Sequence, residues 1–536
     1  MNELTVLDCT LRDGGYYNSW DFSRELVDDY LEAMSAAKVD IVELGQRFVS
    51  SNDFKGPHAF TTDEFLRSLN VPSNLRIAVM VNGSDLLAKP SLEQVLAQLF
   101  PESGPSSPVD IVRIACHLHE IERVLPASDW LKANGFSVGF NLMQIADRTR
   151  DEVVEVAKAA SRHPVDVLYF ADSMGSMSPA QTAEIVGWLR EGWSGPIGIH
   201  THDNMGIALQ NTMRAVAEGV SWLDATVTGM GRGPGNARTE ELVIETSDLR
   251  GREVNLVPLL ALIRRHMRPM KEQYGWGTNP FYFLSGKYGI HPTYVQEMVG
   301  DPRYDEEDIL AVIEYLRQRD GKKYSASSLA AARTFFSGDP HGSWKPATLM
   351  EGRDVLLIGS GPGALRHRDA IQSYIRREAP LVLALNTQSA LDQDFIDLRV
   401  ACHPVRLLAD AQEHLKLPQP LIAPASMLPS KLQQELGTKD LLDFGICIED
   451  GKFEVDEDTC TIPNSLVISY ALAIACSGKA KTIFLAGFDG YEPGDQRNVE
   501  MESMIELYQS SVDAPRLVAV TPTTYSGVAI RSIYGM

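Results

Sequence analysis

Two histidines that share one side of an extended segment are the first chemical signal in the chain. His200 and His202 lie in the run GIHTHDNMG. Side chains two positions apart in a strand point to the same side, so both imidazoles can bind one metal ion. Together with the carboxylate of Asp13 they would leave open coordination positions, which suits Mn²⁺, Mg²⁺, Co²⁺ or Fe²⁺ more than a closed structural zinc site. The alternative is a chance pair on a surface strand.

Asp13 itself follows an apolar run in the segment LDCTLRDGG, which predicts a first strand that leads into Arg12, Asp13 and two glycines. An arginine stays charged at any physiological pH, so at a reaction centre it can stabilise an oxyanion without losing its proton. We therefore expect Arg12 and Asp13 to stand where the first strand meets a site for chemistry.

A glycine-rich loop, GMGRGPGNARTEELV at residues 229–243, is the third signal. Its glycines let the backbone approach a ligand closely, and Asn236 offers an amide oxygen near the start of the next helix. A flexible turn in which Asn236 only caps that helix is the alternative.

These residues need a frame that brings them together, and the first half of the chain predicts one. Short apolar or β-branched runs alternate with helix-compatible segments. Eight such units in about 250 residues predict a closed (β/α)₈ barrel, although an open doubly wound sheet would show the same alternation. The runs begin at Leu4, Asp40, Arg76, Val109, Phe136, Asp166, Pro196 and Trp222.

Polar residues at the strand ends favour the barrel. Active sites of that fold lie at the C-terminal face, where the ends of all strands converge. Besides the residues already named, the strands end at or near Glu43, Arg113, His117, Asn141 and Asp172.

The rest of the chain predicts two further parts, so that the expected domains are a barrel at 1–255, a helical extension and linker at 256–345, and a second α/β domain at 346–536. In the extension, Lys287, Tyr288 and His291 are expected either to form a lid or to belong to a simple packing extension. In the last domain, Gly359, Gly361 and Gly363 between a strand and a helix form a candidate phosphate-binding turn. A turn without a ligand is the alternative reading of these glycines.

Composition excludes several classes of partner. The 536 residues hold 49 basic and 71 acidic side chains, a net charge of −22, which disfavours binding to nucleic acid or to anionic lipid. The N-terminus does not have the pattern of a leader peptide, and no apolar run approaches the roughly 20 residues that span a bilayer. The six cysteines lack CxxC spacing and are expected to be reduced. We expect a cytoplasmic protein.

Five motifs in order, LDCTLRDGG, VELG, ADSMG, HTHDNMG and GMGRGPGNARTEEL, resemble the pyruvate-carboxylate-lyase-like metal-dependent barrels over residues 1–250. That group contains 4-hydroxy-2-oxovalerate aldolase, 3-hydroxy-3-methylglutaryl-CoA lyase and the isopropylmalate synthases. The resemblance implies three metal ligands, Asp13, His200 and His202, with Asn236 completing the metal set or lying just behind it. It also implies a set of residues around the substrate, Arg12, Glu43, His117 and Asp172. Either Glu43 or Asp172 could instead be a structural carboxylate.

The segment RIACHLHE is most similar to the aldolases, so the resemblance implies a carbon–carbon lyase that cleaves a 2-oxo acid through a metal-bound, pyruvate-type enolate. The expected cofactor is Mn²⁺ or Mg²⁺, with Co²⁺, Fe²⁺ and Zn²⁺ as alternatives. Two other functions stay open, an acyl-CoA-dependent Claisen synthase and a binding protein with a vestigial barrel.

The chain departs from these families at the general base. The aldolases carry a histidine shortly after the Arg-Asp-Gly element, where this chain has Tyr16 and Tyr17, and the loop after the eighth strand lacks the cysteine of the lyases. Tyr16 is the remaining candidate, although a tyrosine with a pKa near ~10 is a poor base at neutral pH.

The C-terminal segment resembles the Rossmann-like domains of lipooligosaccharide sialyltransferases and of 6-hydroxymethylpterin pyrophosphokinase-like proteins. This second resemblance implies a nucleotide or nucleotide-sugar ligand. The expected partners are thus a 2-oxo acid, an aldehyde and a nucleotide-linked or phosphorylated compound, with the chain forming a homo-oligomer.

Overall fold

The computed structural model describes residues 3–49, 54–88, 91–299, 306–318, 340–403, 406–407, 410–428, 430–449, 451–491 and 495–536. The chain divides into two compact units, Met1–Tyr304 with Ile313–Tyr324, and Asp305–Val312 with Ser325–Met536. Within the described ranges, no helix is both long and apolar enough to cross a membrane. The predicted domain boundaries at 255 and 345 stay a prediction.

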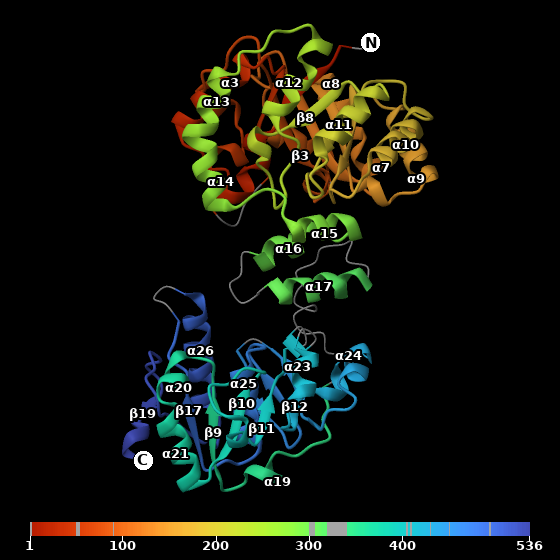
Figure 1. Ribbon diagram of the computed structural model, residues 1–536. Coiled ribbons are helices and arrows are strands. Elements are labelled where there is room, and N and C mark those ends of the chain that lie inside the picture. Colours follow the sequence, from red (N-terminus) through yellow and green to blue (C-terminus); the bar gives the residue numbers. More distant parts are fainter. Residues whose placement is uncertain are drawn as a thin grey trace. The chain divides into compact units, whose positions relative to one another are not determined.

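The first unit contains a closed barrel of eight parallel strands, coloured red to yellow in Figure 1. The barrel closes because β1 pairs with β8 as well as with β2. This confirms the predicted barrel over the open sheet, and every predicted strand is present. The strands are β1 Thr5–Asp8, β2 Ile41–Gln46, β3 Arg76–Asn82, β4 Ile111–His117, β5 Ser137–Met143, β6 Val167–Asp172, β7 Ile197–Thr201 and β8 Trp222–Ala225.

Helices surround the barrel, and several of them begin where a side chain accepts a hydrogen bond from a first-turn backbone N–H group. Ser23 and Ser178 cap α3 and α10, and Thr149 and Glu152 form a capping box on α9. The helices are α1 Thr10–Asp13, α2 Gly15–Asn18, α3 Arg24–Ala36, α4 Asp63–Arg67, α5 Gly83–Leu86, α6 Leu92–Leu99, α7 Ile121–Val124, α8 Pro126–Ala133, α9 Arg150–Ala160, α10 Pro179–Arg190, α11 Ala208–Ala217 and α12 Thr239–Arg250.

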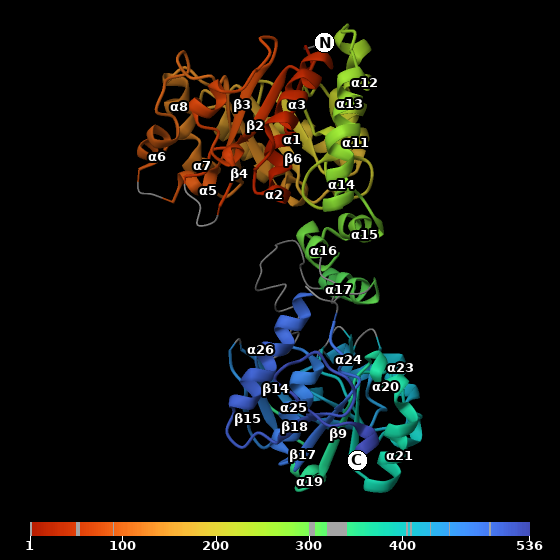
Figure 2. The ribbon, with the colours of Figure 1, turned by 90° about the vertical axis from the view of Figure 1, so that its left-hand side faces the viewer.

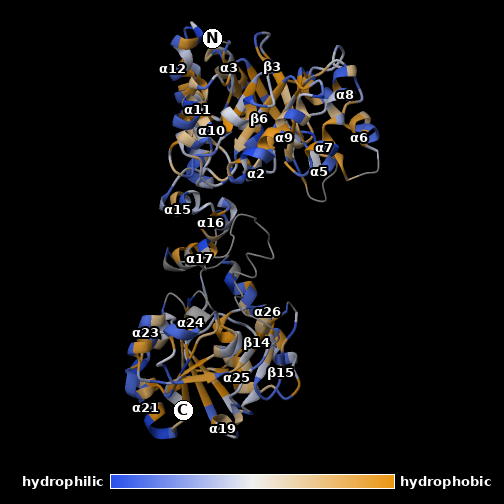
Figure 3. Ribbon diagram, turned by 90° about the vertical axis from the view of Figure 1, so that its right-hand side faces the viewer, coloured by the Kyte–Doolittle hydropathy of each residue, from blue (hydrophilic) through white to orange (hydrophobic). Residues whose placement is uncertain are grey.

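Each strand serves two cores, as the alternation of side chains requires. Val112 and Ile114 of β4 pack in the core between barrel and helices, whereas Ile111 lies inside the barrel with Leu7 and Ile41. The apolar strands stand out in Figure 3.

A buried charge network lies above this inner apolar layer. Arg113 follows Ile111 by two positions, so its side chain also points into the barrel. Its Nη1 lies 3.2 Å from Oε1 of Glu43 and its Nη2 lies 2.5 Å from Oδ2 of Asp224. The guanidinium also lies 4.1 Å from the ring centre of Tyr169. The side chains of Arg113, Glu43 and Asp224 are 0 % exposed.

A helical extension follows the barrel and belongs to the same unit up to α16. Its elements are α13 Val257–Leu262, a π-turn at Ile263–Met267, α14 Arg268–Tyr274, α15 Pro280–Tyr288 and α16 Pro292–Val299, after which α17 covers Glu306–Gln318. The indole of Trp276 donates to the carbonyl of Thr228 at 3.2 Å, and the hydroxyl of Thr278 donates to that of Asn204 at 2.6 Å. The extension is thereby attached to the loops that follow β7 and β8.

The second unit contains a parallel sheet in the order β13-β12-β11-β10-β9-β17-β18-β19. Val355 and Leu357 of β9 face the core with α25 and α26, and Leu356 and Ile358 face the core with α21, so helices cover both faces. The predicted C-terminal α/β domain is confirmed. The chain runs outward from β9 in one direction and returns through β17 in the other, which makes the β9–β17 boundary the switch point where such sheets bind ligands.

The strands of that sheet are β9 Asp354–Ile358, β10 Leu381–Leu385, β11 Leu398–Val400, β12 Leu421–Ala423, β13 Leu441–Asp443, β17 Thr482–Ala486, β18 Arg516–Ala519 and β19 Ala529–Ile530. Its helices are α19 Ala347–Met350, α20 Pro362–Arg366, α21 Arg368–Glu378, α23 Ala411–Lys416, α24 Ser430–Glu435, α25 Val467–Ser477 and α26 Gln496–Ser510. A small sheet of β14 Gly445–Ile448, β15 Glu454–Val455 and β16 Thr459–Ile462, which the sequence did not predict, completes the unit (Figure 2).

The charge network inside the barrel makes a stability prediction. Replacing Arg113 by leucine leaves Glu43 buried with Arg12 as its cation and Asp224 buried with His200 beside it, and the loss of the shared guanidinium should lower the free energy of unfolding by about 3–5 kcal/mol. Urea unfolding followed by tryptophan fluorescence measures the change. The control is Arg24→Leu, since the exposed Arg24–Asp28 pair on α3 should be worth less than about 1 kcal/mol. Equal effects of the two substitutions would contradict the prediction.

Candidate active site

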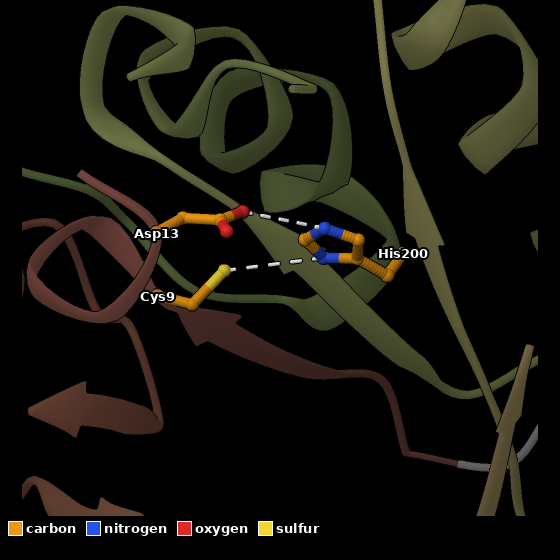
Figure 4. A group of neighbouring side chains, drawn as sticks. All are labelled: Cys9, Asp13 and His200. Atoms are coloured by element: carbon orange, nitrogen blue, oxygen red, sulfur yellow. Dashed lines mark hydrogen bonds and ion pairs between the residues drawn. The ribbon is translucent and has the colours of Figure 1, made fainter. Parts of the chain in front are cut away.

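Asp13 and His200 meet at the C-terminal end of the barrel (Figure 4). Asp13 ends the short helix α1 that follows β1, and His200 lies near the end of β7. Nε2 of His200 lies 3.4 Å from Oδ2 of Asp13, and its Nδ1 lies 3.1 Å from Oδ2 of Asp224. Burial alone would lower the pKa of His200, but the hydrogen bonds with Asp13 and Asp224 raise it above its ordinary value.

Asn236 joins Asp13 from the loop that follows β8. Its amide nitrogen donates to Oδ2 of Asp13 at 2.6 Å, and the amide oxygen is buried with no hydrogen-bond partner among the described residues. An isolated β-bridge between Asn236 and His202 holds this loop beside the end of β7. Asn236 therefore lies at the site and does not merely cap α12, whose N-cap residue is Arg238.

His202 lies beside His200, as the alternation of side chains along a strand predicts. The two rings are 5.3 Å apart at their centres and nearly perpendicular. Nδ1 of His202 contacts the carbonyl of Ser173 at 3.0 Å, which leaves Nε2 for a ligand. Burial, with His200 close by, lowers the pKa of His202 to about 3, so the imidazole is neutral at physiological pH.

Arg12 is fixed by two carboxylates. Its Nε donates to Oε2 of Glu43 at 2.8 Å, and its Nη1 donates to Oδ1 of Asp13 at 2.5 Å. Nη2 is buried and has no hydrogen-bond partner in the part of the chain that the structure describes. A buried donor without a partner is costly, so this amino group is a strong candidate for contact with a bound anion.

These donors fit a divalent cation. A carboxylate, two imidazoles and an amide oxygen that has no hydrogen-bond partner among the described residues form a mixed oxygen and nitrogen set with open positions. The structure also brings Cys9 near, with ligand atoms of Cys9, Asp13 and His200 all within 4.8 Å of one another. Burial raises the pKa of the Cys9 thiol, which donates to the carbonyl of Ala225 at 3.5 Å, so Cys9 is expected to remain a protonated packing residue.

The carboxylates of Asp172 and Glu43 both contact groups that surround the candidate metal ligands. The carboxylate of Asp172 accepts backbone N–H groups of Ser176 at 3.0 Å and of Met177 at 3.2 Å and so organises the loop after β6. Burial raises the pKa of Asp172 to about 7. Glu43 bridges Arg12 and Arg113. In the geometry of the free protein, both are positioning residues.

His117 ends β4 and lies on the inner side of the barrel, four positions beyond Arg113. Its ring stacks on that of His119 with centres 5.5 Å apart, and its backbone N–H donates to Glu120 at 2.9 Å. The structure thus places His117 at the barrel mouth.

The two tyrosines after Asp13 take different positions. The hydroxyl of Tyr17 donates to the carbonyl of Gly231 and accepts from the N–H of Gly233, both at 3.0 Å. Burial raises the pKa of Tyr17 to about 12, which makes it a structural anchor and no base. Tyr16 is 40 % exposed, and the guanidinium of Arg232 lies 4.4 Å from its ring centre.

Asp224 is the functional residue that the sequence interpretation missed. It binds both Arg113 and His200 from the middle of β8. The signal was present, because Asp224 is an acidic residue inside the apolar run WLDATV.

The glycine-rich turn of the second unit lies at the switch point between β9 and β17. The N–H of Gly363 donates to the carboxylate of Asp489 at 3.0 Å. A side chain at Gly361 would come within 2.4 Å of Asp489 and within 2.6 Å of the carbonyl of Gly487. The absence of side chains at Gly361 and Gly363 thus allows the loop after β17 to pack against this turn. A ligand at the turn stays a prediction.

Comparison with known proteins identifies the class of protein to which this chain is similar. The sequence profile of the HMGL-like family matches residues 109–260. The chain is 31% identical over 244 residues to 4-hydroxy-2-oxovalerate aldolase from Pelotomaculum thermopropionicum, which covers 45% of this chain and 69% of the relative. It is 26% identical over 300 residues to oxaloacetate decarboxylase from Mycobacterium tuberculosis, with 55% and 85% covered.

A solved structure agrees. The crystal structure of the N-terminal domain of a candidate aldolase from Bacteroides vulgatus superimposes with a TM-score of 0.50 at 34% identity, covering 55% of this chain and 96% of that domain. The fold and the site thus define a barrel enzyme with a candidate metal centre. The chain belongs to the HMGL-like family, with 4-hydroxy-2-oxovalerate aldolases among its relatives.

Proposed function

We propose that the barrel is a divalent-metal-dependent aldolase that cleaves a 4-hydroxy-2-oxo acid into a pyruvate-type product and an aldehyde. The observation that carries this proposal is the geometry of Arg12. Its guanidinium is held by Glu43 and Asp13 beside the candidate metal ligands, and one amino group has no hydrogen-bond partner in the described part of the chain. The 4-hydroxy-2-oxovalerate aldolases among the relatives support the same reaction.

The residues that would hold the metal are Asp13, His200, His202 and Asn236. A divalent ion such as Mn²⁺ or Mg²⁺, when bound, supplies Lewis-acid polarisation of the carbonyl of a 2-oxo acid. Cleavage of the bond between C3 and C4 leaves an electron pair on C3 that is delocalised to the C2 oxygen. Arg12 is placed to donate a hydrogen bond from Nη2 to that oxygen as its negative charge develops.

The surrounding charges keep these groups oriented. Asp224 lies against Nδ1 of His200 and so leaves Nε2 directed at Asp13. Glu43 holds Arg12 through Nε and is itself held by Arg113. Because every member is buried, little reorganisation is needed when charge develops on the substrate.

Tyr16 is the candidate for moving the proton of the C4 hydroxyl. It lies one residue before the anchored Tyr17, on α2, and is exposed beside Arg232. Glu43, Asp172 and His117 complete the proposed set around the substrate.

Arg12 gives the most direct test of this mechanism. The Mn²⁺-loaded wild-type chain should release pyruvate from 4-hydroxy-2-oxovalerate, measured by coupled oxidation of NADH with lactate dehydrogenase. Arg12→Lys should lower kcat by about 10²–10³-fold with little change in KM, because the planar guanidinium matters most where charge develops. The control is Arg47→Lys, at a buried pair with Asp63. An unchanged kcat in Arg12→Lys would remove the residue from the mechanism.

We further propose that the second unit binds a nucleotide-linked or phosphorylated compound at its switch point. Three features support this proposal. The strand order puts a switch point between β9 and β17, a glycine-rich turn at Gly359, Gly361 and Gly363 follows β9, and Ser360 in this turn is exposed.

Calorimetry of the full chain with CMP-, UDP-, GDP- and dTDP-linked sugars tests this second proposal. We expect a Kd in the micromolar range, about −8 kcal/mol, for at least one of these ligands. Ser360→Asp should weaken binding about tenfold by repelling the phosphate without entering the crowded interior of the turn, whereas Ser360→Ala should not. If no ligand of the panel gave heat of binding, the proposal of a nucleotide site would be refuted. The same would follow if Ser360→Asp left the binding unchanged.

A further inference from the structure

Two buried side chains inside the barrel have amide oxygens without a partner. Gln46 ends β2 and is 1% exposed, and Asn141 lies in β5 and is 4% exposed. Oε1 of Gln46 and Oδ1 of Asn141 are both buried, and neither accepts a hydrogen bond from the residues that the structure describes. Because nearly all buried polar atoms of folded proteins are hydrogen-bonded, two such exceptions in one interior require a reason.

A bulge in β2 turns Gln46 into the barrel. Simple alternation would point Gln46 outward, because it follows the inward-pointing Glu43 by three positions. However, Glu43 pairs with Ala78 of β3. Gln46 pairs with Met80, so three steps along β2 match two steps along β3. Ala78 lies inside the barrel, and Met80 two positions later and Gln46 beside it therefore point inward as well. The bulge requires glycine at Gly45, since a side chain there would lie 1.9 Å from a backbone oxygen of the following loop.

Asn141 points into the same interior. It pairs with Tyr169 of β6, whose ring lies beside the guanidinium of Arg113 in the barrel. On its other side it pairs with Ala115 of β4, which follows Arg113 by two positions. The two amides thus lie on strands three apart in the ring of eight, and both are directed at the space that the strands enclose.

Small side chains share this level of the interior with the amides. The inward positions two residues beyond Arg113 and Tyr169 are both alanines. They are Ala115 of β4 and Ala171 of β6, where barrels of this kind commonly have bulky branched residues. Ala171 pairs with His200 of β7, so the alanines lie at the level of a candidate metal ligand and occupy little space there.

The amide oxygens define the chemistry of the group that would meet them. An amide oxygen only accepts, so a carboxylate or a phosphate, which also only accepts, would leave it unsatisfied. An ammonium group is disfavoured in an interior that already holds Arg12 and would hold a divalent ion. A neutral hydroxyl can donate its proton to the amide oxygen. The hydroxyls of Tyr169 and Thr226 also have no partner among the described residues, but a hydroxyl can donate or accept and so does not distinguish between ligands.

We propose that Gln46 and Asn141 bind hydroxyl groups of the substrate, so that the aldehyde substrate of the barrel is a hydroxylated aldehyde. This inference rests on the proposed aldolase function and names the class of aldehyde. A 4-hydroxy-2-oxo acid with a plain alkyl chain carries one hydroxyl proton, at C4, which can satisfy only one amide oxygen. A further hydroxyl on the part derived from the aldehyde satisfies the second oxygen, whereas an alkyl chain leaves it buried without a donor.

Addition of pyruvate to three aldehydes of equal chain length tests this substrate class. Propanal carries no hydroxyl, lactaldehyde carries one and glyceraldehyde carries two. The Mn²⁺-loaded wild-type chain should use lactaldehyde or glyceraldehyde with a kcat/KM at least about tenfold higher than that for propanal. The reason is that a site with buried polar groups rejects an analogue that lacks the matching hydroxyl.

Apolar substitutions of similar size separate the contribution of the amides from the intrinsic reactivity of the aldehydes. Gln46→Met and Asn141→Leu should each lower kcat/KM for the preferred hydroxylated aldehyde by about 3–10-fold, the effect of losing a hydrogen bond between uncharged groups. Neither should lower kcat/KM for propanal by more than about twofold. Both should leave the melting temperature unchanged or higher, because the amide oxygens that they remove have no partner in the described part of the chain.

Asn211→Leu is the matched control. Asn211 on α11 is 1% exposed, and its amide nitrogen donates to the carbonyl of Met177 at 2.8 Å. This substitution should lower the melting temperature and leave the ratio of kcat/KM between the hydroxylated aldehyde and propanal unchanged.

The outcomes separate the two hypotheses. A wild-type chain that adds pyruvate to none of the three aldehydes refutes the aldolase function itself, and the substrate class with it. A wild-type chain that is active but does not prefer a hydroxylated aldehyde overturns the substrate class alone. Equal losses for all three aldehydes in Gln46→Met and Asn141→Leu, or no loss at all, would also overturn it, because the amides would then not act on a hydroxyl of the substrate.

Discussion

A continuous line of buried charges determines where the reaction centre of this barrel can lie. Arg12, Glu43, Arg113, Asp224 and His200 follow one another through direct contacts, and each is at most 6% exposed. Removing any one of them would leave its neighbours buried with fewer counter-charges, at a cost of several kcal/mol. The network connects the ends or interiors of β2, β4, β7 and β8 with the loop after β1, so the strands cannot shift independently without separating these pairs.

The positions where this chain differs from its aldolase relatives have a physical explanation in the same region. Tyr17 anchors the loop after β8 through both of its hydroxyl contacts, and this loop presents Asn236 on one side and Arg232 on the other. The extension after the barrel binds the same loop through Gly277 and Gly233. Tyr17 thus links the loop after β1 to the loop after β8 at the barrel mouth.

The sequence predicted the parts of the fold that depend on local pattern and missed those that depend on distant pairing. Alternating apolar runs gave every barrel strand, and residue spacing placed His200 and His202 on one face. Asp224 was missed because its partners, Arg113 and His200, lie far away in the chain. The strands β13, β15 and β19 have two or three residues each and no buried position, so they carry no clear alternation. β16 does alternate in burial, but it is only four residues long. The anchoring role of Tyr17 was not predicted, because its contacts with Gly231 and Gly233 span more than two hundred residues.

Anomalous diffraction at the manganese edge, from crystals of the full chain grown with Mn²⁺, tests the central claim most directly. The account predicts a peak within about 2.5 Å of a carboxylate oxygen of Asp13 and of ring nitrogens of His200 and His202, with Asn236 or solvent beside it. Manganese density absent from the barrel, or found only at the second cluster of possible ligands, Glu25, Asp29 and His266, would contradict the account.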